Sequence, residues 1–399
     1  METAQSRATA SSPPSSGKPK ANVPLLDVNR STAELREELL AATARVIDSG
    51  KFLHGEDVTQ LEQSIAKICG VEHAIACASG SDALLLALMA LDIGDGDEVI
   101  VPSFSFFATA SAVWRLGAKP VFVDINPQTF NLDPNRIEDA ITPLTRAIIP
   151  VHLFGQCADM DAIGLVAQQH SLHIIEDAAQ AIGAHFKSWP AGSMSAVGCL
   201  SFYPTKNLGA FGDGGMLTTH DAALASRLRL LAAHGMSPRY YHHVVGINSR
   251  LDSLQAAVLN VKLNRLAAWT SSRQANAARY DQLLRRAGLD AQLVMPALDP
   301  RCNHVWNQYS VRIPGGRRDA VRASLAAAGV GSEVYYPVPL HQQKCFQSLG
   351  YAPGSLPHTE KAAREVLSLP IFPELTSAEQ ETVVRGLSEA LYSPARKAA

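Results

Sequence analysis

The chain alternates between short runs of apolar residues and longer stretches in which apolar positions recur every three or four residues. Residues 73–175 show this alternation most clearly, with runs rich in valine, isoleucine and alanine. Short continuous apolar runs are typical of buried strands, and the longer period is typical of helices that pack on one face. Strands of this kind favour a mostly parallel sheet with helices on both faces. The expected strands are residues 73–77, 98–101, 120–124, 147–151 and 172–175, and the expected helices between them are residues 82–91, 106–116, 136–141 and 160–169.

The segments on either side of this region are mainly helical in pattern. A helix is expected over residues 23–47, with Ser31 as its N-cap and Glu34 three residues later, and a second over residues 57–69 that ends at Gly70. After Asn248 the pattern changes, and no internal repeat is found. The elements expected there are helices at 251–266, 271–287, 318–328, 359–367 and 377–391 and a strand at 309–313.

These patterns predict an α/β protein with two domains. We expect a large domain over residues 23–267 and a smaller C-terminal α+β domain over residues 268–399. Residues 1–22 are rich in serine, alanine and proline and have too few apolar residues to pack, so they are expected to form a disordered tail.

Charge and cysteine content exclude several classes of partner. The formal net charge of −2, without a sustained basic block, gives no reason to expect nucleic acid or an anionic membrane. No apolar run is long enough to span a bilayer. The six cysteines form no Cys-x-x-Cys pair, which is typical of a protein from a reducing, cytoplasmic compartment. The histidines, including the pair His242 and His243, have no metal-ligand spacing, so no metal site is expected.

Lys206 lies in a short polar break between an apolar run and a glycine-rich turn, downstream of Asp177. A lysine presented this way can form a Schiff base with pyridoxal phosphate, and a carboxylate can keep the nitrogen of the cofactor ring protonated. Either residue alone is weak evidence, because a single lysine is usually solvated and an aspartate after an apolar run is usually a helix cap. Together with the serines below, they favour a pyridoxal phosphate site.

Ser79–Asp82 lies between an expected strand and an expected helix, where unpaired backbone N–H groups suit a phosphate. Ser79, Gly80, Ser81 and Ser201 are the candidate phosphate donors, although Ser79 alone fits an ordinary N-cap equally well. Parallel sheets place ligands at the carboxyl ends of their strands.

Two further side chains extend the candidate site. Phe106 is placed to stack on the cofactor ring, in competition with Phe104 and Phe107, and Gln180 is placed to donate to its phenolic oxygen. The glycines after Lys206 fit neither the dinucleotide fingerprint nor the P-loop pattern, which counts against a nicotinamide oxidoreductase.

An ordered set of motifs resembles the DegT-like family of sugar-nucleotide aminotransferases, a branch of the fold type I enzymes that use pyridoxal 5'-phosphate. The resemblance spans roughly residues 23–391, and the set is specific although each motif alone is not. The motifs are Ser79–Asp82, Gly96–Ser103, Val151–Gly155, Glu176–Gln180, Ser201–Gly209, Gly246–Asp252 and Tyr336–His341.

The resemblance implies the three-layer fold type I architecture and a role for each matching residue. Lys206 is implied as the Schiff-base lysine and proton carrier. Asn248 is implied to reach the phosphate of the neighbouring subunit's cofactor, with Arg250 nearby, which predicts a homodimer with shared sites. Tyr336 and His341 fall in the segment implied to face the sugar nucleotide, and Arg250 is the third residue expected to contact the substrate. Two positions depart from the family pattern: Ser81 replaces the more common threonine, and Tyr335 replaces a frequent histidine.

The activity expected from this resemblance is transfer of an amino group, from L-glutamate, to a nucleotide-linked keto sugar for amino-sugar or polysaccharide synthesis. A sugar 3-dehydrase on the same scaffold carries histidine at the lysine position, so Lys206 counts against it. An aminotransferase of free amino acids stays open, because arginines that suit a substrate carboxylate are present at Arg312, Arg317, Arg318 and Arg364. A non-catalytic regulator on the same fold is the third alternative, which the intact Lys206 and Asp177 disfavour.

Overall fold

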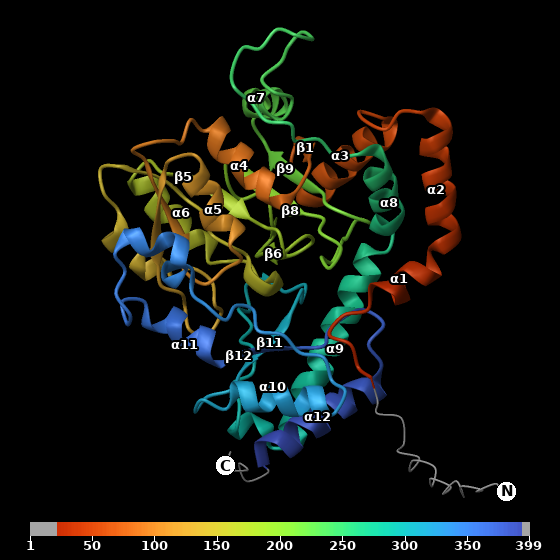
Figure 1. Ribbon diagram of the computed structural model, residues 1–399, viewed down its shortest axis with the longest axis vertical. Helices are drawn as coiled ribbons and strands as arrows, with labels where there is room; N and C mark the ends of the chain where they lie inside the picture. Colours follow the sequence, from red (N-terminus) through yellow and green to blue (C-terminus); the bar gives the residue numbers. More distant parts are fainter. Residues whose placement is uncertain (1–21, 393–399) are drawn as a thin grey trace, which may run out of the picture.

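The computed structural model describes residues 22–392, which build a seven-stranded sheet with helices around it (Figure 1). Apart from Asn22, the predicted tail lies outside the described residues. The strand order is β1-β9-β8-β5-β4-β2-β3. The strands are β1 (His73–Cys77), β2 (Glu98–Pro102), β3 (Lys119–Val123), β4 (Thr145–Ile148), β5 (His173–Asp177), β8 (Val197–Ser201) and β9 (Gly215–Thr219).

The prediction of a mostly parallel sheet is confirmed. β3, β2, β4, β5 and β8 pair in parallel, whereas β9 runs antiparallel to both of its neighbours, β1 and β8. β8 and β9 were not predicted as strands, since glycine and polar residues interrupt their apolar runs. β9 is nevertheless buried along its whole length.

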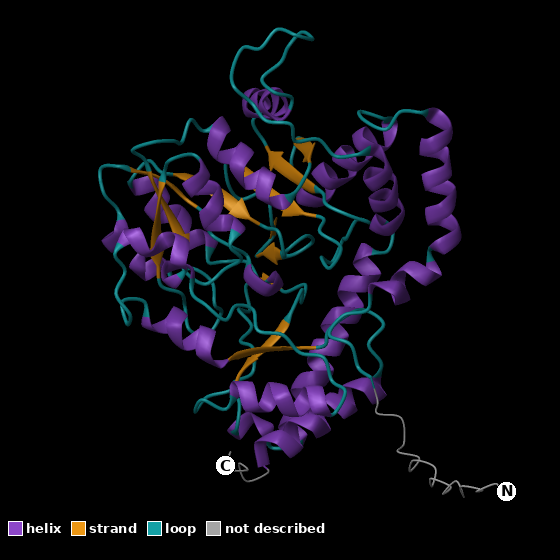
Figure 2. Cartoon of the chain, in the orientation of Figure 1, coloured by secondary structure: helices purple, strands orange, loops and turns teal. Residues whose placement is uncertain are grey.

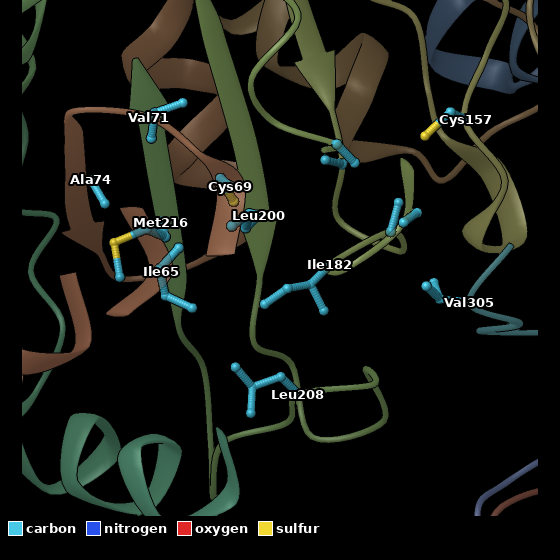
Figure 3. Packing of buried hydrophobic residues seen from close by; sticks show 14 of the residues in the cluster. Ile65, Cys69, Val71, Ala74, Cys157, Ile182, Leu200, Leu208, Met216 and Val305 are labelled. Carbon is cyan, nitrogen blue, oxygen red and sulfur yellow. The ribbon is translucent and has the colours of Figure 1, made fainter. Parts of the chain in front are cut away.

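Successive residues of each strand alternate between two hydrophobic clusters, as expected for side chains that point to opposite faces of a sheet. On one face, Leu200 and Met216 lie in a cluster with Ile65 and Cys69 of α3 (Glu56–Cys69) (Figure 3). The same cluster contains residues of α6 (Met160–Gln169) and α8 (Ser253–Leu263). On the other face, the adjacent Cys199 and Leu217 pack with helices that cover the opposite side. These helices are α4 (Gly80–Ala90), α5 (Ala108–Arg115) and α7 (Ala222–Ala232). The three-layer architecture is therefore confirmed.

The N-terminal helix differs from the prediction. It is broken into α1 (Val28–Glu34) and α2 (Arg36–Ser49), and α1 is capped by Asp27, whose carboxylate accepts a hydrogen bond from the backbone nitrogen of Asn29. Ser31 is not a cap but lies inside α1. The helix expected at 136–141 is instead a pair of short 3-10 turns, Pro134–Arg136 and Glu138–Ala140.

The C-terminal part contains a two-stranded antiparallel sheet of β11 (Tyr309–Arg312) and β12 (Val366–Leu369), with helices beside it (Figure 2). These are α9 (Leu266–Arg286), α10 (Arg318–Ala327), α11 (Pro357–Glu365) and α12 (Ser377–Tyr392). A separate hydrophobic cluster joins them, and it also takes in Val23 and Phe104 from the N-terminal part. The domain boundary near residue 267 stays a prediction.

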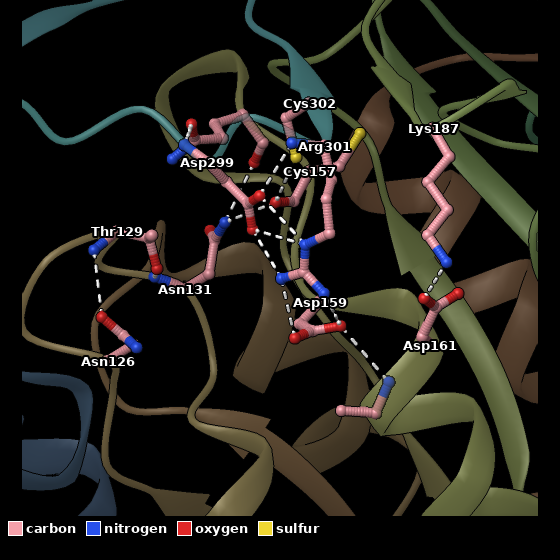
Figure 4. Close-up of polar contacts among 12 residues, drawn as sticks. Asn126, Thr129, Asn131, Cys157, Asp159, Asp161, Lys187, Asp299, Arg301 and Cys302 are labelled. Carbon is pink, nitrogen blue, oxygen red and sulfur yellow. Dashed lines mark hydrogen bonds and ion pairs between the residues drawn. The ribbon is translucent and has the colours of Figure 1, made fainter.

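A third, small sheet connects the two parts through β10 (Cys302–Asn303), β6 (His185–Phe186) and β7 (Trp189–Pro190). Beside it, the guanidinium of Arg301 bridges the carboxylates of Asp159 and Asp299 (Figure 4). Asp159 is the N-cap of α6, so this ion-pair cluster ties the segment before β11 to a helix of the main sheet.

Candidate active site

A cavity of about 580 Å³ opens at the carboxyl ends of the parallel strands. This is the edge where parallel sheets place their ligands, because loops of several strands converge there. Nine of the residues predicted from the sequence line it: Ser79, Gly80, Ser81, Phe106, Asp177, Gln180, Ser201, Lys206 and Tyr336.

Lys206 is carried by a closed turn between β8 and β9. The backbone nitrogen of Ala210 donates to the carbonyl of Phe202 at 2.8 Å, which joins the two ends of the turn. Gly209 presses against Pro204 so closely that a Cβ at this glycine would lie 2.3 Å from the proline carbonyl oxygen. Burial lowers the pKa of Lys206 to about 8, opposed by the charge of Asp177. A much larger fraction of the amine is therefore neutral near pH 8 than for an exposed lysine.

Side chains from elsewhere in the chain hold this turn. The amide of Asn207 donates to the carbonyl of Val305 at 2.9 Å and accepts from the amide of Asn307 at 3.1 Å. The amine of Lys262 on α8 donates to the carbonyl of Gly209 at 2.7 Å. All three contacts are buried, so they hold the turn that carries Lys206 against the segment between β10 and β11 and against α8.

Asp177 is the last residue of β5 and is buried. Its carboxylate accepts hydrogen bonds from the hydroxyl of Thr109 at 2.8 Å and from the backbone nitrogen of Ala179 at 3.2 Å. Burial raises the pKa of Asp177, while these two hydrogen bonds and the charge of Lys206 act in the opposite direction. A buried carboxylate held in this way can accept a charge-assisted hydrogen bond from a protonated ring nitrogen.

The N-terminus of α4 forms the phosphate corner of the cavity. Ser79 is the N-cap, and its hydroxyl oxygen accepts from the backbone nitrogen of Asp82 at 3.1 Å. Gly80 approaches Ser201 so closely that a Cβ there would lie 2.6 Å from the Cβ of Ser201. The unpaired N–H groups of the first turn, with the hydroxyls of Ser81 and Ser201, suit a phosphate without any cation. The donor set therefore fits a phosphorylated cofactor.

The three competing phenylalanines occupy different environments. Phe104 is buried against Phe130, and Phe107 packs on Phe346 with ring centroids 5.6 Å apart. Phe106 lines the cavity and exposes 56% of its surface. Of the three, Phe106 is therefore the one placed to cover a cofactor ring, and its stacking role stays a prediction.

Three predicted residues lie away from this cavity. His341 is buried, and its Nδ1 lies 2.6 Å from the hydroxyl of Ser103, so the structure does not bring it to the place expected for a substrate contact. Asn248 and Arg250 line a second cavity, of about 440 Å³. The two cavities share Asp213.

The sequence profile of the DegT/DnrJ/EryC1/StrS aminotransferase family matches residues 33–388. The chain belongs to this family. Its fold agrees with the crystal structure of S. venezuelae DesV in complex with a ketimine intermediate, with a TM-score of 0.90 and 45% sequence identity; the match covers 94% of this chain and 99% of that chain. The protein is thus a pyridoxal phosphate-dependent aminotransferase, as the sequence predicted.

Two relatives illustrate the range of names within the family. A "Pleiotropic regulatory protein" of Geobacillus stearothermophilus is 50% identical over 368 residues, which cover 92% of this chain and 98% of that protein. The UDP-N-acetyl-3-dehydro-alpha-D-glucosamine 3-aminotransferase of Acidithiobacillus ferrooxidans is 47% identical over 366 residues, which cover 91% of this chain and 97% of that protein.

Several residues of this aminotransferase site were not found from the sequence. Thr109, which bonds to Asp177, and Asn207, which anchors the lysine turn, are the clearest examples. The only local signal for Thr109 is a polar residue on the apolar face of α5. Among residues 22–392, no group of three or more His, Cys, Asp or Glu side chains is arranged to hold a metal ion, and no helix there is long and apolar enough to cross a membrane.

Proposed function

We propose that this aminotransferase transfers an amino group from L-glutamate to a nucleotide-linked keto sugar. One observation carries the proposal: Lys206 and Asp177 face the same cavity as the N-terminus of α4. A lysine nucleophile, a carboxylate for a ring nitrogen and a phosphate corner are the three groups that pyridoxal phosphate needs. Bound there, the cofactor withdraws electrons from the substrate carbon and stores the amino group.

The side chains of the cavity then have separate tasks. Lys206 would hold the cofactor through Nζ, and its free amine would carry a proton to and from the substrate carbon. Asp177 keeps the ring nitrogen protonated. Ser79, Gly80, Ser81 and Ser201 bind the phosphate, and Phe106 covers one face of the ring.

The relatives support a sugar nucleotide as amino acceptor. The Acidithiobacillus ferrooxidans enzyme is named for amino transfer to carbon 3 of a UDP-linked 3-dehydro sugar. We propose the same class of acceptor, a 3-keto sugar linked to a nucleotide, and a cytoplasmic role in amino-sugar or polysaccharide synthesis. The regulatory name of the Geobacillus stearothermophilus relative favours a second candidate, a regulator on the same fold. The assembled lysine, aspartate and phosphate corner support catalysis instead.

We propose further that the working enzyme is a homodimer with shared sites. Asn248 is exposed, and Arg250 makes no hydrogen bond or ion pair with another residue of the described chain. Both lie outside the cavity of their own subunit that contains Lys206. This supports the expectation that Asn248 reaches the cofactor phosphate of a neighbouring subunit, with Arg250 nearby as a substrate contact.

The visible absorbance of the purified protein tests the proposal. We expect a yellow protein whose band is bleached by L-glutamate and restored by a UDP-linked 3-keto sugar. Lys206→Ala should lack the native band and lose turnover, because no amine remains to hold the cofactor or carry the proton. A wild type that stays colourless with added pyridoxal phosphate would favour the regulator. A Lys206→Ala variant with near-normal turnover would contradict the assigned lysine.

A further inference from the structure

The side-chain amide of Gln180 has a single chemically allowed orientation. Its Oε1 lies 2.7 Å from the backbone nitrogen of Phe154. A backbone N–H can only donate, so the atom that faces it must be the amide oxygen. The amide nitrogen therefore faces the other way, toward the hydroxyl of Tyr336 at 3.2 Å. Gln180 is buried, so packing keeps the amide in this position.

The orientation of Gln180 decides what the Tyr336 hydroxyl can do. An amide nitrogen donates and cannot accept, so the hydroxyl oxygen of Tyr336 accepts from Gln180 and keeps its own proton for another partner. No other described residue hydrogen-bonds to this hydroxyl, and Tyr336 lines the cavity that contains Lys206 and Asp177. Burial, the largest cause, raises the pKa of Tyr336, so the hydroxyl stays protonated at neutral pH.

We propose that Tyr336 donates a hydrogen bond to the phenolic oxygen of the cofactor, beside Gln180. This inference rests on the proposed function and adds a second donor to the one predicted from the sequence. The second hydrogen of the Gln180 amide has no partner among the described residues, so two adjacent donors are left for one ligand oxygen. Such a pair suits an oxygen that carries negative charge. The ring of Phe106, expected to cover the cofactor, lies 6.2 Å from that of Tyr336.

A pH titration of the visible band of the holoenzyme tests this role. A hydrogen bond donated to the phenolic oxygen of the cofactor withdraws electron density from that oxygen. The oxygen then binds less tightly the proton that it shares with the nitrogen of Lys206, so the pKa of that proton is lower. Tyr336→Phe should therefore raise the midpoint of the titration by about one pH unit, the order of effect of one charge-assisted hydrogen bond. The other titratable side chains that line the cavity stay in place: Lys206, Asp177, Asp213, Tyr203 and Tyr335.

Tyr335→Phe is the matched control, because Tyr335 lines the same cavity and its hydroxyl makes no hydrogen bond to a described residue. It should leave the midpoint unchanged. If the Tyr336→Phe midpoint equals that of wild type, the proposal is wrong. The proposal is also wrong if Tyr336→Phe raises only the KM for the keto sugar, since the Tyr336 hydroxyl would then bind the substrate instead of the cofactor. A wild type without any visible band contradicts the proposed function itself, so the two failures are distinguishable. Equal melting temperatures of the three proteins exclude a general loss of structure.

Discussion

At the scale of single residues, the carboxylate of Asp177 depends on a neighbour that the sequence did not reveal. The buried Thr109 hydroxyl donates to Asp177 at 2.8 Å and favours its charged form. Thr109→Val removes this donor without changing the volume much. We expect kcat to fall by roughly tenfold or more, since hydrogen bonds to charged groups contribute about 1.5–3 kcal/mol. The acidic limb of the kcat–pH profile should also move to higher pH, because the pKa of Asp177 rises when the Thr109 hydrogen bond is lost.

Thr109→Ser keeps the hydroxyl and serves as the control for this prediction. The kcat–pH profiles of the two variants are the measurement. A valine variant whose profile matches that of the serine variant would show that the hydrogen bond has no part in catalysis.

The residues found from the sequence are those that form a recognisable combination, although each alone is weak evidence. Asp177 and Lys206 were found because an aspartate after one apolar run and a lysine after a later one, together with the serines of the phosphate corner, have few other uses as a set. Thr109 was missed because a polar residue on the apolar face of a helix does not reveal its partner, which is 68 residues away. His341 was expected at the substrate because of its motif, but a motif does not show which side of a segment faces the cavity.

At the scale of elements, the turn that carries Lys206 depends on Lys262 of α8. The Lys262 amine is buried, bonds to the carbonyl of Gly209, and lies 4.5 Å from the centroid of the Phe211 ring. Burial lowers its pKa to about 8. Below that pH the folded protein must bury a charge that the unfolded chain exposes to water, so this lysine opposes folding there. This destabilisation disappears as pH rises from about 8 towards the ordinary pKa of lysine, because the folded protein then buries a neutral amine.

Lys262→Met keeps the unbranched stem and removes the amine. We expect a melting temperature at least equal to that of wild type at pH 6–7, with the difference shrinking above pH 8. We also expect a lower kcat at unchanged KM, because the turn is less firmly held. Lys262→Gln, which keeps a donor for Gly209, should recover part of kcat. A methionine variant with wild-type kcat would show that this contact is dispensable for catalysis.

At the scale of the whole molecule, the order of strands could not be read from the sequence. Local pattern predicted β1 to β5, since their residues are apolar enough to be recognised alone. It missed β8 and β9, which contain glycine because other backbone segments press on them: a Cβ at Gly198 would lie 2.5 Å from the Cα of Gly192. That close approach is a property of the folded chain. Placing β9 between β1 and β8 brings the N-terminus of α4 beside the lysine turn, which assembles the cavity.

The shared site of the proposed homodimer gives a prediction at the same scale. Lys206→Ala removes the nucleophile, and Asn248→Asp places a negative charge where a phosphate is expected, so each homodimer should be nearly inactive. In a mixed dimer, purified through two different tags, one site combines the intact Lys206 of one subunit with the intact Asn248 of the other. The mixed dimer should therefore recover about half of the wild-type activity, because one of its two sites is complete. As a control, a mixed dimer of Lys206→Ala and Asp177→Ala should stay inactive, since both residues line the same cavity of one subunit. If the first mixed dimer is as inactive as its parents, Asn248 acts within its own subunit and the sites are not shared.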